Sequence, residues 1–324
     1  MSKSLPQLGD RRATTADPAT PADPVVAVAG AVKRFGATVA LDGLDLTLRQ
    51  GEILGFLGPN GAGKTTTTRA LLGQIRLTAG TAHVFGRDAW SDAVAIHRRL
   101  ASVPGDVALW PGLTGGECID VLTRLHGGAD PAVRAQLLER FELDPTKRSR
   151  TYSKGNRQKV ALVAALAVPV ELLILDEPTA GLDPLMEAQF QEVVRERAED
   201  GVSVLLSSHI LDQVEALCDR VAIVRNGRII RSGSLVELRS QALTTVQATV
   251  GQPHRDLAEL DGVDSFRADA VDGRWRLSAR VSAEALDPVV RRLLDDGGGS
   301  LVVQPPTLDE LFLDEYRGAG AATP

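Results

Sequence analysis

Short apolar runs separated by glycines characterise residues 25–48. This pattern predicts a small antiparallel sheet, because a strand with one buried face needs apolar side chains at alternate positions. A compact apolar run at residues 52–57 predicts a buried strand, which leads into a glycine-rich turn. A helix is expected after that turn, over residues 64–75. The glycines that interrupt the first segment are Gly30, Gly36 and Gly43.

Helical spacing of the apolar positions sets in between residues 110 and 143. Within this region Asp130 precedes Pro131, and this pair is typical of an N-cap followed by proline at the first helical position. A second Asp-Pro pair begins at Asp183 and opens a further helix, which Gly201 ends. Two separate helical segments are therefore expected.

Three further segments predict strands. Residues 172–175 are apolar without alternation, which is typical of a parallel strand that is covered on both faces. Residues 202–206 form another apolar run. Residues 223–230 predict a hairpin, because Asn226 and Gly227 are favoured where both turn residues need positive φ.

The character of the sequence changes near residues 238–244, and the remainder predicts a small α+β domain. A helix is expected over residues 283–294, followed by a glycine turn at 297–299. Thr307 and Glu310 form a capping box for a last helix. The strands expected in this part are residues 245–250, 265–268, 275–281 and 301–303.

This organisation divides the chain into four segments. Residues 1–24 are polar and rich in alanine, proline and threonine, so a disordered tail is favoured over a targeting segment. Residues 25–238 form the larger domain, residues 239–316 a small C-terminal accessory domain, and residues 317–324 a second tail. No apolar stretch has the length and continuity of a membrane span, so a soluble chain is expected and any membrane role needs a partner.

The overall composition is that of an ordinary folded protein, with 324 residues, 44% hydrophobic and 24% charged. The net charge of −6 argues against a general nucleic-acid binder, because phosphate backbones favour basic surfaces. The two cysteines, Cys118 and Cys218, predict neither a disulfide framework nor a zinc site, and a reducing compartment fits them best.

A phosphate-binding loop is the most specific single motif. It matches G-x-x-x-x-G-K-[ST] between a predicted strand and a predicted helix, so an ordinary glycine turn explains it poorly. Backbone N–H groups and the helix N-terminus would surround the phosphates of ATP. Lys64 would reach the β- and γ-phosphates, and Thr65 would bind Mg²⁺. Thr66 is also expected to contact the nucleotide. Four successive threonines, residues 65–68, are poor helix formers, so their presence suggests a functional demand on at least the first two. The loop is Gly58, Pro59, Asn60, Gly61, Ala62, Gly63, Lys64 and Thr65.

Two acidic residues end the apolar strand at 172–175. Ligands of open parallel sheets bind at the carboxyl ends of the strands, where the phosphate loop also lies. Asp176 is therefore expected to hold Mg²⁺. Glu177 is expected to act as the general base toward the attacking water. In the alternative interpretation, Glu177 is only the polar residue at which the strand ends.

Three further residues have a candidate role beside a structural one. His209 follows the strand at 202–206 and would contact the γ-phosphate or hold the water-activating geometry; the alternative is a surface or core histidine. Asp183 would contact the opposite subunit across the nucleotide in addition to capping its helix. Phe35 would stack on adenine, or else is a buried aromatic of the sheet.

A Ser-Lys-Gly-Asn turn at residues 153–156 opens an apolar helix between the phosphate loop and the acidic strand. It has no phosphate of its own to bind in the same site, which suggests a half-site completed by a second copy of the domain.

This ordered set resembles the ATP-binding subunits of ABC transporters over residues 25–238. The resemblance implies an α/β fold, a P-loop NTPase cassette with a parallel core sheet, an antiparallel β subdomain and a helical subdomain. It identifies 58–65 as Walker A, 153–157 as the signature and 172–177 as Walker B, with a D-loop at 180–183. It further implies that two copies meet head to tail around two ATP, each held between the 58–65 loop of one copy and Ser153 and Gly155 of the other. Hydrolysis at Glu177 would then separate the two copies.

The subgroup that serves ABC-2 type drug and antibiotic exporters is the most similar, because its ATPase is a separate chain with a small C-terminal domain. The resemblance implies multidrug or antibiotic efflux through a separate membrane permease. The ATPase would lie peripherally on the cytoplasmic face of a bacterial plasma membrane. The helical region at 110–143 would dock that permease, or would simply pack on the core.

Two departures from the family pattern affect communication between sites. The glutamine of the Q-loop is missing within residues 102–111, where Gly105 and Asp106 stand. Asp106 offers an oxygen to magnesium or water. The signature has Lys154 and Asn156 where the family prefers glycine and glutamine; Lys154 favours phosphate electrostatically.

Two other functions compete with transport. One is a soluble ATPase of the same superfamily that acts on ribosomes or nucleic acid, but such translation factors carry two cassettes and this chain has one loop of the 58–65 type. The other is a nucleotide-gated module without turnover, which Glu177 and His209 argue against.

Overall fold

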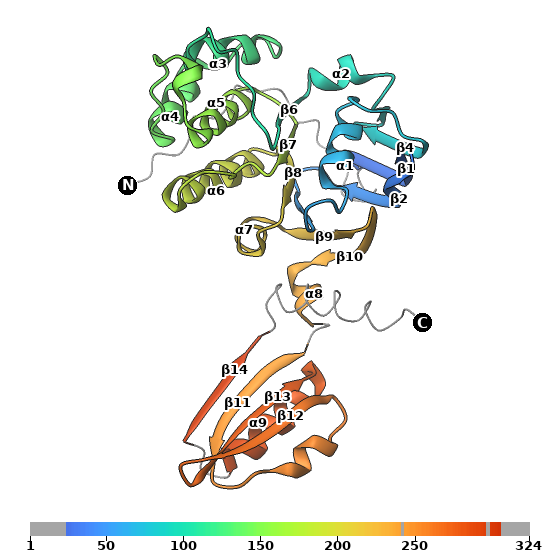
Figure 1. The fold of residues 1–324 in the computed structure, drawn as a ribbon, viewed down its shortest axis with the longest axis vertical. Coiled ribbons are helices and arrows are strands. Elements are labelled where there is room, and N and C mark those ends of the chain that lie inside the picture. Colours follow the sequence, from blue (N-terminus) through green and yellow to red (C-terminus); the bar gives the residue numbers. More distant parts are fainter. Residues whose placement is uncertain (1–23, 241–242, 296–298, 306–324) are drawn as a thin grey trace. The chain divides into compact units, whose positions relative to one another are not determined.

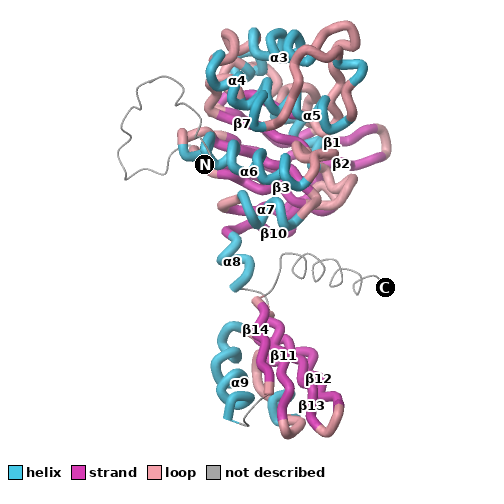
Figure 2. Tube along the Cα trace, turned by 90° about the vertical axis from the view of Figure 1, so that its left-hand side faces the viewer, coloured by secondary structure: helices cyan, strands magenta, loops and turns pink. Residues whose placement is uncertain are grey.

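A computed structural model of the chain describes residues 24–240, 243–295 and 299–305 (Figures 1 and 2). The chain divides into two compact units, which meet in sequence between Ser232 and Gly233. The predicted tails and the predicted capping box at Thr307 and Glu310 lie outside the described residues.

The first sheet is antiparallel and has the strand order β2-β1-β4-β5. Val26 pairs with Leu48 and Val28 with Leu46, and these four side chains enter one core. The antiparallel sheet predicted from residues 25–48 is confirmed. Its strands are β1 (Val26–Phe35), β2 (Thr38–Leu48), β4 (Ala79–Val84) and β5 (Arg87–Asp88).

The second sheet carries the site and has the order β10-β9-β3-β8-β7-β6. The strands from β9 to β6 pair in parallel. Every residue of β3 and β7 is buried, which confirms that these apolar runs are covered on both faces. The strands are β3 (Ile53–Leu57), β6 (Leu100–Val103), β7 (Leu172–Asp176), β8 (Ser203–Ser208), β9 (Arg220–Arg225) and β10 (Arg228–Ser234).

Helices cover both faces of this sheet (Figure 1). Helix α1 packs between the two sheets, and Leu71 joins Phe56 and Leu41 in their common core. Helix α5 is buried from Gln158 to Leu166, where it packs against α3, α4 and α6. The helices are α1 (Lys64–Leu71), α2 (Ala93–His97), α3 (Gly115–Arg124), α4 (Pro131–Arg140), α5 (Lys154–Leu166), α6 (Pro184–Glu199) and α7 (Leu211–Leu217), with a 3₁₀ turn at Ser149–Thr151.

The helix starts follow the predicted caps. The Asp130 side chain accepts hydrogen bonds from two backbone N–H groups of α4, and that of Asp183 accepts one from α6. Between β9 and β10, Asn226 and Gly227 both have positive φ, of 48° and 74°, so the predicted hairpin turn is confirmed.

The second unit is a four-stranded antiparallel sheet of order β12-β13-β11-β14 with one helix packed on a face (Figure 2). Val246, Leu277 and Val289 belong to its separate core. The predicted α+β character is confirmed. The elements are α8 (Leu235–Ser240), β11 (Thr244–Val250), a 3₁₀ turn at Arg255–Glu259, β12 (Val263–Val271), β13 (Arg274–Val281), α9 (Ala283–Asp295) and β14 (Ser300–Gln304).

Helix α1 and several short elements of the first unit, among them helices α2 and α7, differ from the sequence prediction. Helix α1 ends at Leu71, because Gly73 takes a left-handed φ of 62° and turns the chain, so the predicted extension to residue 75 is wrong. Strands β4, β5 and β6 were not predicted, since their short runs are rich in glycine, alanine and charged residues. Among the described helices, none is long and apolar enough to cross a membrane.

Candidate functional site

A pocket of about 340 Å³ opens at the carboxyl ends of the core strands. The loop between β3 and α1 lines it with Pro59, Asn60 and Gly61 and with residues 63–66. Glu177 and His209 line it from the ends of β7 and β8. The pocket therefore joins the phosphate loop to the residues predicted to act in hydrolysis.

The phosphate loop is shaped by glycines at positions where a side chain does not fit. A Cβ at Gly58 would lie 2.5 Å from the carbonyl oxygen of Val224, and Gly63 has φ of 113° at the N-cap of α1. At Gly61, by contrast, an added Cβ would meet open space, although φ is 82°. The backbone at Gly61, which lines the pocket, is therefore open to the approach of an anion.

Lys64 lies at the floor of the pocket and is 5% exposed. Its Nζ donates to the carbonyl oxygens of Gly58 at 2.5 Å and Pro59 at 3.3 Å. The same ammonium forms an ion pair with Glu177 Oε1 at 3.2 Å. The loop therefore presents a fixed positive charge.

The Glu177 carboxylate contacts two side chains in this structure, those of Lys64 and His209. Beside the ion pair with Lys64, its Oε2 lies 2.5 Å from His209 Nδ1. The carboxylate remains partly accessible, at 20% side-chain exposure, and His209 is half-exposed. The predicted convergence of these residues is seen; their catalytic roles stay predictions.

Asp176 is the last residue of β7 and is 3% exposed; it does not itself line the pocket. The Ser207 hydroxyl donates to its Oδ1. Gly105 lines the pocket on the other side, where an added Cβ would lie 3.6 Å from Asp176 Oδ2. Thr65 and Thr66 line the same pocket, so carboxylate and hydroxyl oxygens that suit Mg²⁺ gather there.

The signature residues begin helix α5. The Ser153 hydroxyl caps this helix by accepting from Asn156 N at 3.2 Å, and Lys154 reaches the rim of the pocket. Gly155 packs against Gly181 so closely that a Cβ would overlap the Gly181 carbonyl oxygen. Ser153 and Gly155 do not line the pocket, and their contact with the nucleotide of a second copy stays a prediction.

Replacing Gly155 by alanine is expected to lower the free energy of unfolding by about 1–3 kcal/mol, because the added methyl group forces the 180–183 loop to move. Urea denaturation measures the change. Gly112→Ala is the control, since a Cβ there meets nothing within 4 Å. Equal midpoints for the two variants would contradict the packing argument.

The remaining predicted residues lie at the edge of the pocket or outside it. Phe35 is 51% exposed at the end of β1, with Lys33 Nζ 4.8 Å from its ring centroid, so its interpretation as a buried aromatic is wrong. Adenine stacking by Phe35 stays a prediction. Asp106 is exposed and does not line the pocket, although Gly105 does. Metal binding by Asp106 and a contact of Asp183 with a partner likewise stay predictions.

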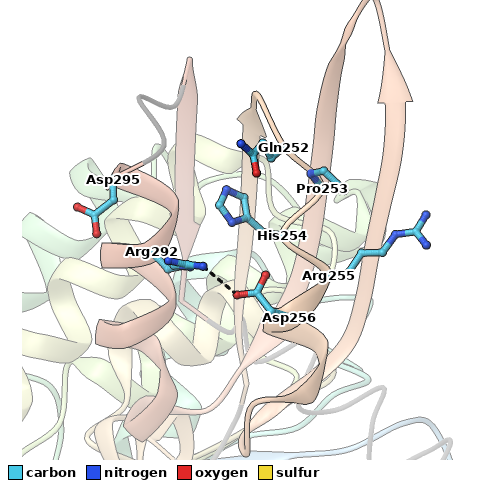
Figure 3. A pocket seen from close by; sticks show the side chains of 7 residues that line it. All are labelled: Gln252, Pro253, His254, Arg255, Asp256, Arg292 and Asp295. Atoms are coloured by element: carbon cyan, nitrogen blue, oxygen red, sulfur yellow. Dashed lines mark hydrogen bonds and ion pairs between the residues drawn. The ribbon is translucent and has the colours of Figure 1, made fainter.

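A second hollow, of about 460 Å³, lies in the C-terminal unit (Figure 3). Arg255 and Arg292 are balanced there by Asp256 and Asp295, and Arg292 pairs with Asp256 at 3.4 Å across it. This hollow has neither a glycine loop nor an excess of positive charge among these four residues, and we do not assign nucleotide binding to it.

Comparison with known proteins identifies the family. Residues 41–180 match the family model described as ABC transporter. The chain is 40% identical over 305 residues to the daunorubicin resistance ATP-binding protein DrrA3 of Streptomyces coeruleorubidus, covering 90% of this chain and 96% of the relative. The chain belongs to the ABC transporter family. It is an ATP-binding subunit of that family and an ATPase.

Two further matches support the family assignment. The linearmycin resistance ATP-binding protein LnrL of Bacillus subtilis is 32% identical, with 87% of this chain and 95% of that protein covered. A solved structure of the ATP-binding subunit of an ABC transporter superposes with a TM-score of 0.62 at 30% identity, over 67% of this chain and 92% of the other. The predicted fold class, a P-loop cassette with antiparallel β and helical parts, is confirmed.

The motif segments singled out in the sequence contain every residue that lines the pocket except Ala40, but they do not include Ser207, whose hydroxyl donates to Asp176. Ser207 carries only a weak signal, a hydroxyl two residues before His209 at the end of an apolar strand. A buried polar residue there predicts a hydrogen-bond partner but does not say which one.

Proposed function

We propose that this ATPase drives export of a drug or antibiotic through a separate membrane permease. The observation that carries the proposal is the convergence of Lys64, Glu177 and His209 in one pocket at the phosphate loop. The names of the relatives, which concern resistance to daunorubicin and linearmycin, support efflux as the process. They favour transport over action on ribosomes or nucleic acid.

The nucleotide chemistry is assigned to this chain's own residues. Loop 58–65 binds the phosphates, and Lys64 compensates charge on the β- and γ-phosphates. Thr65 and Asp176 would hold Mg²⁺, which supplies charge neutralisation to the phosphates when bound. Glu177 accepts a proton from the attacking water, and His209 orients the Glu177 carboxylate.

The ion pair of Glu177 with Lys64 has a consequence for the order of events. Phosphate oxygens compete for the same ammonium, so ATP binding weakens the 3.2 Å contact. Glu177 is then held by His209 alone and is available to water. Nucleotide binding and activation of the base are thereby coupled through one lysine.

A second copy of the chain completes each site in this proposal. Ser153 and Gly155 lie outside their own pocket, and Ser153 presents an exposed helix start to a phosphate. Two copies that meet head to tail place this start over the partner's ATP. Gly181 lies against Gly155, and the 180–183 loop, which includes Asp183, would bridge the two sites.

Docking of the permease is assigned to residues 90–125, which run from just after β5 to the end of helix α3. Exposed apolar side chains concentrate along residues 90–125. Such side chains favour burial against a partner. The ATPase would then sit peripherally at the cytoplasmic face of the plasma membrane. The residues are Trp90, Val94, Trp110, Val121 and Leu125.

The test is co-expression of the chain with the membrane protein encoded beside it. Inverted membrane vesicles from these cells should accumulate a fluorescent anthracycline when ATP and Mg²⁺ are supplied. Vesicles that contain the Glu177→Gln variant are the control and should accumulate none. ATP hydrolysis without any ATP-dependent accumulation of drugs would contradict efflux and leave the ATPase assignment intact.

A further inference from the structure

Ser207 lies at the end of β8 and contacts both acidic residues of the site. It is 1% exposed, so its hydroxyl has no bulk water to bond. The hydroxyl donates its proton to Asp176 Oδ1 and lies 3.2 Å from the backbone nitrogen of Glu177, which donates to it. One buried side chain therefore links two consecutive residues whose proposed roles differ.

The bond to Asp176 separates the two oxygens of that carboxylate. Oδ1 is engaged by Ser207, whereas Oδ2 lies toward Gly105, a residue that lines the pocket. The hydrogen bond fixes the rotation of the carboxylate about its Cβ–Cγ bond. A single oxygen is thus directed toward the place where the metal of the nucleotide would bind.

The bond to Glu177 stabilises an unfavourable backbone conformation. Glu177 has φ of 48°, in the left-handed region that a residue with a long side chain seldom adopts. Its N–H is shared between the carbonyl oxygen of Ser207 at 3.1 Å and the hydroxyl of the same serine at 3.2 Å. Strained residues persist where several contacts determine them, and here both contacts come from one residue.

We propose that Ser207 is the positioning residue of the hydrolytic site, which sets the metal-binding oxygen of Asp176 and the backbone turn that aims Glu177. The proposal rests on the roles assigned to these two residues above. Ser207 does not touch nucleotide; it acts through the two carboxylates. Outer residues of this kind typically contribute about 10- to 100-fold to metal affinity or activity.

Ser203 offers a matched control on the same strand. It is also 1% exposed, and its hydroxyl accepts a backbone N–H bond from Gly51 at 3.0 Å. It lies at the opposite end of β8, away from the carboxylates. Loss of either hydroxyl removes a buried hydrogen bond, but only loss of the Ser207 hydroxyl frees Asp176 Oδ1 and leaves the Glu177 N–H with the Ser207 carbonyl oxygen alone.

The experiment compares Ser207→Ala and Ser207→Cys with Ser203→Ala in the full chain. Cysteine keeps nearly the size of serine and is a weak donor, so it serves if the alanine variant folds poorly. Binding of a fluorescent ATP analogue is measured in EDTA and during a Mg²⁺ titration. We expect the Ser207 variants to need about 10- to 100-fold more Mg²⁺ for half-maximal tightening, with unchanged affinity in EDTA. Ser203→Ala should match the wild type in both measurements.

If ATP binding by the wild type responds to Mg²⁺, either of two outcomes would overturn this inference and leave the proposed function intact. One is a Mg²⁺ requirement of the Ser207 variants that equals the wild-type requirement. The other is an equal loss of affinity with and without Mg²⁺, which indicates a merely structural role. A wild-type chain whose ATP binding does not depend on Mg²⁺ would instead overturn the proposed metal role of Asp176, and the inference with it.

Discussion

Replacing Glu177 by glutamine should lower the rate of ATP hydrolysis by about 10²- to 10⁴-fold while ATP binding persists, because the amide cannot accept the proton of the attacking water. Glutamine has nearly the same shape, so the pocket is preserved. Because glutamine is neutral, the 3.2 Å ion pair between residue 177 and Lys64 is lost. Lys64 is then more available to phosphate, so ATP affinity should stay equal to that of the wild type or increase.

The same variant should trap the shared state. Without hydrolysis, two copies with two ATP remain associated, and size-exclusion chromatography with ATP and Mg²⁺ should show a dimer. Glu199→Gln is the control, since Glu199 is exposed at the end of α6 opposite to Asp183. A Glu177→Gln chain that stays monomeric at saturating ATP and Mg²⁺ would be strong evidence against a shared site.

The parts of the site that could be predicted from sequence are those whose chemistry is local. A glycine loop between a strand and a helix needs positive φ at named positions, and Gly61 and Gly63 have it. The apolar run at 172–175 has no polar alternation, so it had to be a covered parallel strand with its polar exit at the ligand edge. The convergence of Glu177 and His209 followed from neighbouring parallel strands.

The parts that could not be predicted depend on contacts between distant residues. Gly155 must be small because an added Cβ would overlap the carbonyl oxygen of Gly181, a contact that the local sequence does not reveal. Ser207 bonds Asp176 because β7 and β8 are adjacent in register, with Asp176 opposite Ser207. Phe35 is exposed because it ends β1 beside a tight turn, whereas its aromatic character in a β segment equally fitted a buried position.

Replacing Lys64 by alanine should weaken ATP binding itself, in contrast to the glutamine variant of Glu177. A charge-assisted hydrogen bond contributes about 1.5–3 kcal/mol, so the dissociation constant should rise about 10- to 150-fold. The ammonium is held in place before nucleotide arrives, by the carbonyl oxygens of Gly58 and Pro59. No substituted side chain without a positive charge restores this arrangement.

The measurement is titration with a fluorescent ATP analogue, with Lys64→Met and Lys147→Ala alongside. Methionine retains the apolar stem of Lys64 without its charge and should bind as weakly as alanine. Lys147 is exposed and pairs only loosely with Asp144, at 3.8 Å, so its removal tests the general effect of one lost positive charge. Thermal unfolding without nucleotide shows whether each variant is folded. A folded Lys64→Ala chain with wild-type ATP affinity would rule out the phosphate contact, whereas weakened binding confined to the Lys64 variants would place that contact at this ammonium.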